Sequence, residues 1–175
     1  DALEALDISG CARVTDIGVQ RLRALTTLRV FRANNATAIT GASLRHLAHL
    51  LEFEVLGCKS ITDDDLTSIR YFNTGLTHVA LSSPRVSDKG LSDFLRPLRY
   101  ITHLNLANCL NAGQLVISQL FHRRYRLAYL NLANCIGVSG DHILQPDSPE
   151  SNFPLFTWLG DLQYLNLSGC VRCSA

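Results

Sequence analysis

Apolar residues recur along the chain in one fixed pattern, written apolar-x-x-apolar-x-apolar-x-x-Cys. Five copies of this pattern close at a cysteine: Cys11, Cys58, Cys109, Cys135 and Cys170. Two weaker copies lie between them, one running from Leu25 through Val30 to Ala33 and one closing at Pro84. The seven starts are 22, 25, 26, 25, 26 and 35 residues apart. Self-similarity at such a period predicts a stack of similar structural units.

Each unit continues from a predicted strand into a predicted helix. The alternation of apolar and polar residues in the pattern is typical of a short strand with one buried side. After the strand, five units carry a Thr or Ser suited to capping the start of a helix: Thr15, Thr40, Thr62, Ser87 and Ser139. Apolar residues then recur at helical spacing, for example at Leu66 and Ile69.

This combination predicts the fold class. Units of about 20 to 29 residues with one strand and one helix are typical of leucine-rich repeats, whose strands pair in parallel. We therefore expect an α/β fold, a curved leucine-rich-repeat solenoid in the shape of a horseshoe. Parallel strands should line its concave face and helices its convex face, in about six to seven repeats.

The repeats extend over the whole chain. We expect residues 1–175 to form a single array, and further repeats on at least one side, because strand motifs stand at both ends. The sixth repeat is longer than the others. Three prolines interrupt any regular helix there, at Pro146, Pro149 and Pro154, so residues 145–158 are expected to form an insertion loop.

Composition and motifs reduce the number of function classes that fit this sequence. Sixteen Lys and Arg balance fifteen Asp and Glu, for a formal net charge of +1. That balance gives no indication of nucleic-acid or membrane binding. The sequence has no glycine-rich phosphate loop, no G-x-S-x-G turn, and no Ser, His and Asp set beyond what the repeat explains. We therefore expect a protein that is not an enzyme, that needs no cofactor and that binds other proteins.

The cysteines could belong to a disulfide scaffold, a zinc site or the repeat itself. Cys11, Cys58, Cys109, Cys135 and Cys170 all hold one position of the repeat, where a thiol can bond backbone groups that the turn leaves unpaired. The pair Cys170 and Cys173 is a lone C-x-x-C, without the second pair that a zinc site needs. We expect structural thiols, no metal, and a reducing compartment such as cytoplasm, nucleus, cytoskeleton or cilium.

The polar positions between the apolar ones should point out of the concave face. Charged residues dominate its first half, beside two exposed apolar side chains, and Tyr and Asn dominate its second half. The predicted partner-binding residues are Asp7, Arg29, Phe31, Glu52, Glu54, Leu56, His78, His103, Asn105, Tyr129, Asn131, Tyr164 and Asn166. Two alternatives stay open: the asparagines could form only a solvated ladder, and the adjacent His78 and His103 could hold a metal or a pH-sensitive contact.

Three stretches carry a family resemblance. The sequence Leu-Asn-Leu-Ala-Asn-Cys occurs at residues 104–109 and again at 130–135. A similar sequence, Leu-Asn-Leu-Ser-Gly-Cys, occurs at residues 165–170. With Ile61-Thr62-Asp63, they resemble the cysteine-containing repeat of the F-box leucine-rich-repeat family. The resemblance implies an arc that captures a substrate, and an F-box ahead of the repeats that docks onto a cullin-RING ubiquitin ligase.

A second role is also implied by the resemblance. The same units resemble a member of that family that is a structural subunit of the axonemal nexin–dynein regulatory complex. Neighbouring subunits of that assembly would then be the partners. A leucine-rich-repeat regulator of a small GTPase fits less well, because its repeat subtype differs.

Overall fold

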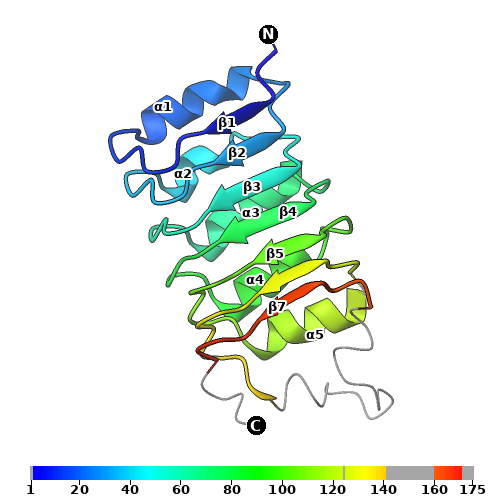
Figure 1. The fold of residues 1–175 in the computed structure, drawn as a ribbon. Helices are drawn as coiled ribbons and strands as arrows, with labels where there is room; N and C mark the ends of the chain where they lie inside the picture. The colour runs from blue at the N-terminus through cyan, green and yellow to red at the C-terminus, as the bar shows by residue number, and fades with distance from the viewer. Residues whose placement is uncertain (1, 124, 141–159, 171–175) are drawn as a thin grey trace.

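The strands form one continuous sheet. A computed structural model of the chain describes residues 2–123, 125–140 and 160–170. Within these ranges lie seven strands, paired in parallel in the order of the chain (Figure 1). They are β1 (Ala5–Asp7), β2 (Val30–Arg32), β3 (Glu52–Val55), β4 (His78–Leu81), β5 (His103–Asn105), β6 (Tyr129–Asn131) and β7 (Tyr164–Asn166). The predicted insertion loop at residues 145–158 lies outside the described residues.

The helices pack along one face of this sheet (Figure 1). They are α1 (Asp16–Gln20), the 3-10 helix η1 (Arg21–Ala24), α2 (Gly41–Leu44), α3 (Asp63–Phe72), α4 (Asp88–Leu95) and α5 (Gln114–Arg123). The predicted α/β leucine-rich-repeat solenoid is confirmed, and within the described residues a helix follows each of the first five strands. Among the described residues, no helix is both long enough and apolar enough to cross a membrane.

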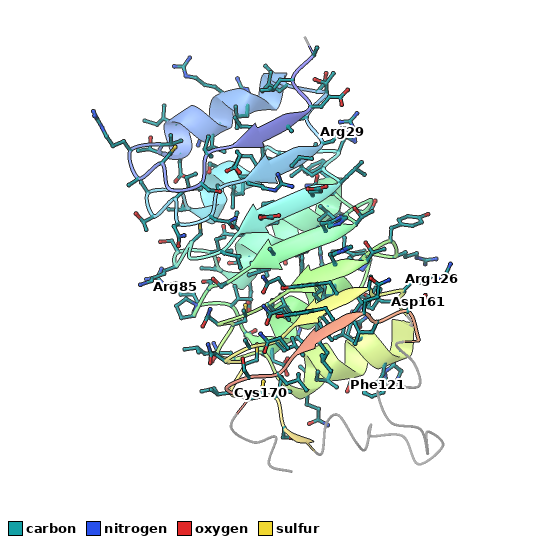
Figure 2. The ribbon with its side chains drawn as sticks, in the orientation of Figure 1. Arg29, Arg85, Phe121, Arg126, Asp161 and Cys170 are labelled. Atoms are coloured by element: carbon teal, nitrogen blue, oxygen red, sulfur yellow. The ribbon has the colours of Figure 1, made fainter. Side chains whose placement is uncertain are left out.

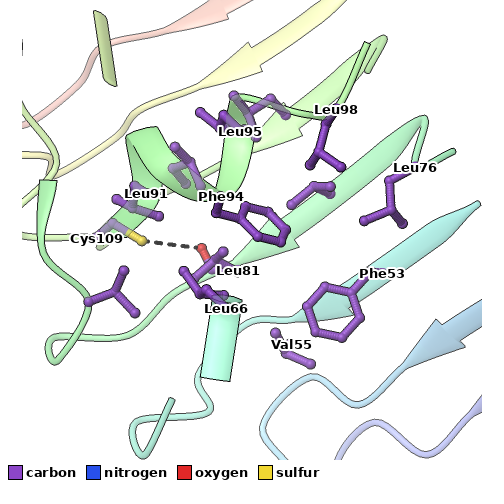
Figure 3. Packing of buried hydrophobic residues seen from close by; sticks show 14 of the residues in the cluster. Phe53, Val55, Leu66, Leu76, Leu81, Leu91, Phe94, Leu95, Leu98 and Cys109 are labelled. Atoms are coloured by element: carbon purple, nitrogen blue, oxygen red, sulfur yellow. Dashed lines mark hydrogen bonds between the residues drawn. The ribbon is translucent and has the colours of Figure 1, made fainter. Parts of the chain in front are cut away.

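The core lies between the sheet and the helices. The central apolar residue of each strand points inward, and Phe53, Leu104 and Leu130 are completely buried. Helix residues such as Leu66 and Phe94 pack against this layer (Figure 3). Leu6, in the first strand, is only partly buried, and the described residues place one unit beside it. The apolar contacts therefore run as one continuous core from unit to unit.

Aspartates at the starts of α1, α3 and α4 bond to the start of the helix in the next unit. Thr40, at the start of α2, donates its N–H and hydroxyl to the carboxylate of Asp16 in α1. Asp88 in α4 accepts N–H groups from Gly113 and Val116 around the start of α5. These bonds satisfy amide groups that a helix start leaves unpaired, and they do so across units.

The turn after each strand fixes the register. Its key residue has a positive φ, which Gly and Asn adopt at low cost. This residue stands directly before the closing position of the pattern in the units that have it: Gly10, Asn35, Gly57, Asn108, Asn134 and Gly169. In the second unit the closing residue is therefore Ala36. The prediction that Ala33 closes this unit is wrong.

Strand pairing confirms this corrected register. Phe31 of β2 pairs with Leu6 and Phe53, and Arg32 pairs with Asp7 and Glu54. The fourth unit also departs from its prediction. Its turn is one residue shorter, so Ser83 is completely buried at the closing position while Pro84 is exposed.

Candidate functional site

The sheet face that the helices leave uncovered, predicted as the concave face, is here termed the open face. Because the strands pair in register, equivalent side chains stack in two columns along it. The first column is Ala5, Val30, Glu52, His78, His103, Tyr129 and Tyr164. The second is Asp7, Arg32, Glu54, Ala80, Asn105, Asn131 and Asn166.

Four rings of the first column form a continuous stack, here termed the ring ladder. The centroids of His78 and His103 lie 4.1 Å apart, with their planes at 14°. The His103 ring lies 6.0 Å from Tyr129, and the Tyr129 ring lies 4.4 Å from Tyr164 at an angle of 3°. Stacking of this kind orders the side chains before any partner arrives, which lowers the entropy lost on binding.

His78 influences the titration of His103. Partial burial lowers the pKa of His103, and the neighbouring His78 lowers it further, while Glu52 acts in the opposite direction. Each imidazole Nδ1 also lies 2.9 Å from a threonine hydroxyl, Thr77 for His78 and Thr102 for His103. The histidines are thus held in place by a hydroxyl on one side and a ring on the other.

An acidic cluster continues the ladder toward the N-terminus. Arg32 lies between Glu52 and Glu54, with N–O distances of 2.5 and 3.1 Å. The amide of Asn34 donates to the other carboxylate oxygen of Glu54 at 3.0 Å. These side chains are roughly a third exposed, so the ion pairs contribute little to stability. Their main effect is to fix the orientation of charges on the open face.

The asparagine column has a structural role of its own. The side-chain oxygens of Asn105, Asn131 and Asn166 each accept the backbone N–H two residues further along the chain, at 3.0, 3.0 and 2.9 Å. Asp7 makes the same bond to the N–H of Ser9. These bonds shape the turn after each strand. The amide oxygens therefore hold the turns of their own units, which differs from a solvated ladder running along the sheet.

A pocket of about 230 Å³ opens beside the ring ladder. His78, His103 and Tyr129 line one side, and Glu54, Leu56 and Asn105 face them. It thus combines aromatic, apolar, amide and carboxylate groups in one place. That mixture suits the side chain of a protein partner better than a charged small molecule.

Two predicted partner-binding residues lie elsewhere. Phe31 is completely buried in the core, because the second unit is shifted by three residues from its predicted register. Arg29 precedes β2, and its guanidinium folds back onto the carbonyls of Thr26 and Leu28. Arg32 takes the place expected for Arg29. One feature of the sequence could have identified Arg32. Asn35 stands directly before Ala36, just as Gly or Asn stands directly before the closing residue in other units.

The other predicted residues lie on the open face. Asp7, Glu52, Glu54, His78, His103, Asn105, Tyr129, Asn131, Tyr164 and Asn166 occupy the two columns, and Leu56 lines the pocket. The structure brings the residues from Glu52 to Tyr164 together as one surface. Asp7 lies at its far end, next to Arg32.

Four of the five cysteines at the closing position of the repeat share one structural role. Cys58, Cys109, Cys135 and Cys170 are buried, and each thiol contacts the carbonyl of the preceding unit's last core residue, as Cys109 does with Leu81 (Figure 3). Burial raises the pKa of Cys109 to about 11 and raises that of Cys135 further. Cys11 is exposed instead, because no described unit precedes its own.

Metal binding finds no support in the described part of the chain. No group of three or more His, Cys, Asp or Glu side chains there is placed to hold a metal ion. The stacked pair His78 and His103 lacks a third ligand of this kind. The open face, as described, offers rings, amides and carboxylates for contact with another molecule.

No protein-family model and no curated protein sequence matches the chain. Solved structures do match. The chain is similar to one in the crystal structure of the yeast Rad7 and Elc1 complex, with a TM-score of 0.57 and 16% identity over 96% of this chain and 57% of that one. It is also similar to the Caenorhabditis elegans tropomodulin C-terminal domain, with a TM-score of 0.50 and 13% identity over 91% of this chain and 83% of that one.

The first of these matched chains is much longer than this one, which spans little more than half of it. At such low identities the comparisons bear on architecture and on nothing finer. They agree with the sheet topology described above. The chain is an α/β leucine-rich-repeat solenoid.

Proposed function

We propose that the chain is a non-catalytic protein-binding module whose open face captures a protein partner. The observation that carries this proposal is the ring ladder, four stacked aromatic side chains from four successive strands beside a pocket. Aromatic side chains in a fixed arrangement are the groups that contribute most to protein interfaces. Tyr164, at the end of the ladder, is 43% exposed and so is available for contact.

The ladder has a polarity that constrains the partner. Its N-terminal neighbours are Glu52 and Glu54, held by Arg32, and its C-terminal end is the pair Tyr129 and Tyr164. A partner that lies along the open face would meet carboxylates at one end and phenol rings at the other. A segment with a basic residue followed by apolar side chains has the complementary chemistry.

The finer role that we propose is substrate recognition in an F-box-type ubiquitin ligase receptor, acting in a reducing intracellular compartment. The repeat resemblance supports this role, as does the likeness of the fold to a chain in the Rad7 and Elc1 complex. The alternative is an architectural subunit of a large assembly such as the axonemal nexin–dynein regulatory complex. Both roles require a protein partner.

The test is capture of partners from cell extract by the immobilised chain. Tyr129→Ala combined with Tyr164→Ala should abolish capture of the proteins that the unchanged chain retains. Both side chains lie on the surface of the sheet, so the fold should be preserved, which far-ultraviolet circular dichroism checks. Leu115→Ala is the matched control, because Leu115 is 48% exposed and lies at the start of α5, away from the open face.

Each result has a definite meaning. Undiminished capture by the double variant would remove the open-face proposal. Cullin-RING components among the proteins retained by the full-length gene product would support the receptor role. Co-sedimentation of that product with axonemes, without such components, would overturn the receptor role in favour of an architectural one.

A further inference from the structure

The two long edges of the solenoid differ in charge, although the chain as a whole is nearly neutral. Arginines gather where helices end and strands begin: Arg21, Arg23, Arg29, Arg45, Arg70, Arg96, Arg99 and Arg126. Figure 2 shows Arg29 and Arg126 at this edge and Arg85 at the opposite one. The edge where the helices end is here termed the arginine edge.

Acidic residues gather at the other edge, in the first turns of α1, α3 and α4, and all of these except Asp64 form hydrogen bonds that hold the fold together. Asp16, Asp63 and Asp88 accept hydrogen bonds from the next unit, and Asp65 accepts them from Thr62. Their carboxylates are therefore turned toward backbone N–H groups. Among the described aspartates in these first turns, Asp64 alone is exposed, so less negative charge is available at this edge than positive charge on the arginine edge.

Two pockets lie side by side on the arginine edge and share Tyr71. One, of about 430 Å³, is lined by Arg45, His46, Thr67, Ser68, Tyr71 and Phe72. The other, of about 470 Å³, is lined by Arg70, Tyr71, Thr74, Arg96, Pro97 and Arg99. No carboxylate lines either pocket among the described residues. The Tyr71 side chain stands between them, 76% exposed.

The arginines differ in how far they are already paired. Arg70 donates to the backbone carbonyl of Asp93, and Arg96 forms an ion pair with its carboxylate at 2.7 Å. Arg45 and Arg99 are exposed, and none of the ion pairs among the described residues includes them. Asp93 thus holds the inner two guanidinium groups in position, while the outer two remain open to a ligand.

Helix stability explains only part of this arrangement. A basic side chain near a helix end interacts favourably with the negative end of the helix dipole, which accounts for Arg45 and Arg70. Arg99 lies beyond the end of α4, and an exposed tyrosine ring gives no such benefit. Arginine and tyrosine together at the rim of a pocket are instead typical of protein interfaces.

We propose that Arg45, Arg70, Tyr71, Arg96 and Arg99 form a second binding surface, for an extended acidic protein segment with an apolar side chain over Tyr71. Guanidinium groups bind carboxylates through paired hydrogen bonds, and the two pockets give such a segment two places to seat them. Neighbouring helices lie about 8–10 Å apart, so about six extended residues cross the surface.

An acidic protein segment fits better than a nucleic acid. Strong binding of a phosphate backbone needs many uncompensated cations, because it depends on the release of many counterions. Here Asp93 compensates Arg96, Asp161 pairs with Arg126 at 3.0 Å, and the net charge of the chain is +1. This surface lies on a different side of the molecule from the ring ladder. Its test is therefore independent of the test of the proposed function.

The test is fluorescence anisotropy with a labelled peptide of alternating Glu and Leu, titrated with the intact chain. We expect saturable binding that weakens with added NaCl, and no binding of the same peptide with Gln in place of Glu. Arg45→Glu combined with Arg99→Glu should weaken binding by at least about tenfold. Arg85→Glu, which reverses an exposed charge on the opposite edge, should leave it unchanged.

Tyr71→Ala separates the apolar contact from the charge. It should weaken binding of the Glu–Leu peptide and have little effect on a peptide of alternating Glu and Ser. Absence of binding to the unchanged chain would overturn the proposal, and so would equal loss in the Arg85→Glu variant. Tighter binding of a labelled single-stranded oligonucleotide than of the peptide would overturn it in favour of a nucleic-acid surface.

Discussion

The carboxylate of Asp63, in the first turn of α3, accepts two hydrogen bonds from Ser87, the residue that caps α4. The Ser87 N–H lies 2.8 Å from Oδ1 and the hydroxyl 2.5 Å from Oδ2. The same hydroxyl oxygen accepts the N–H of Gly90 at 3.0 Å. A methyl group on Gly90 would lie 2.0 Å from the Asp63 carboxylate, so this close approach requires glycine. The start of one helix is thus held by the previous unit.

Asp63→Ala should lower the free energy of unfolding by about 1–3 kcal/mol, because it removes charge-assisted hydrogen bonds to a helix cap. Asp64→Ala is the matched control, since Asp64 is the exposed neighbour in the same helical turn and has the same residue type. It should change stability by less than about 0.5 kcal/mol. Urea unfolding followed by circular dichroism measures both, and equal losses would contradict the role given to Asp63.

Phe31→Ala should cost about 3–5 kcal/mol, because it leaves a large cavity in the core. Phe31 is completely buried, and its ring lies 6.5 Å from that of Phe53. Phe72→Ala removes the same side chain from a position that is 56% exposed, and it should cost far less. A small loss for Phe31→Ala in urea unfolding would restore the original prediction of an open-face residue.

Alkylation with iodoacetamide under native conditions should modify Cys11 well before Cys58, Cys109, Cys135 or Cys170. Cys11 is exposed and the other four are buried. With a pKa of about 11, Cys109 also has little reactive thiolate at neutral pH. Peptide mass spectrometry reads out each site, and the order should disappear once urea unfolds the chain. Rapid native modification of Cys135 would show that its unit opens.

The histidine stack should make stability depend on pH. Because burial and His78 lower the pKa of His103, the unfolded chain takes up a proton at a higher pH than the folded chain does. Stability should therefore fall as pH decreases through about 6.5 toward the lowered value. In His103→Gln this part of the fall should be missing, so its urea midpoint should change less between about pH 7.5 and about pH 5. Between pH 7.5 and 9 the two proteins should behave alike, and identical curves at low pH would exclude His103 as the cause.

The fold and the open face could be read from the sequence because both follow from periodicity. A unit with apolar residues at fixed positions leaves no choice about which side chains of β3 to β7 face the core. The second unit could not be read in the same way. Its residues 25–33 and 28–36 both satisfy the apolar pattern, and only the turn residue Asn35, with φ of 59°, distinguishes them. A backbone requirement, and not hydrophobicity, decides that register.

Two features of the site depend on packing, which a pattern does not contain. The sequence placed His78 and His103 in one column, but whether their rings stack depends on rotamers set by Thr77 and Thr102. The contrast between the two long edges was also missed, since total charge says nothing about its distribution. It emerges only when the repeats stack and the helix starts draw the aspartates inward.

The register that places each ring over the one before it also determines how such a surface can evolve. Copying one whole unit of the gene would extend the ring ladder by one step and leave every existing contact unchanged. Loss or gain of a single residue within a strand would instead turn its binding side chains toward the core. The length of the recognition surface and its chemistry can thus be altered separately, the first by duplication and the second by point substitution.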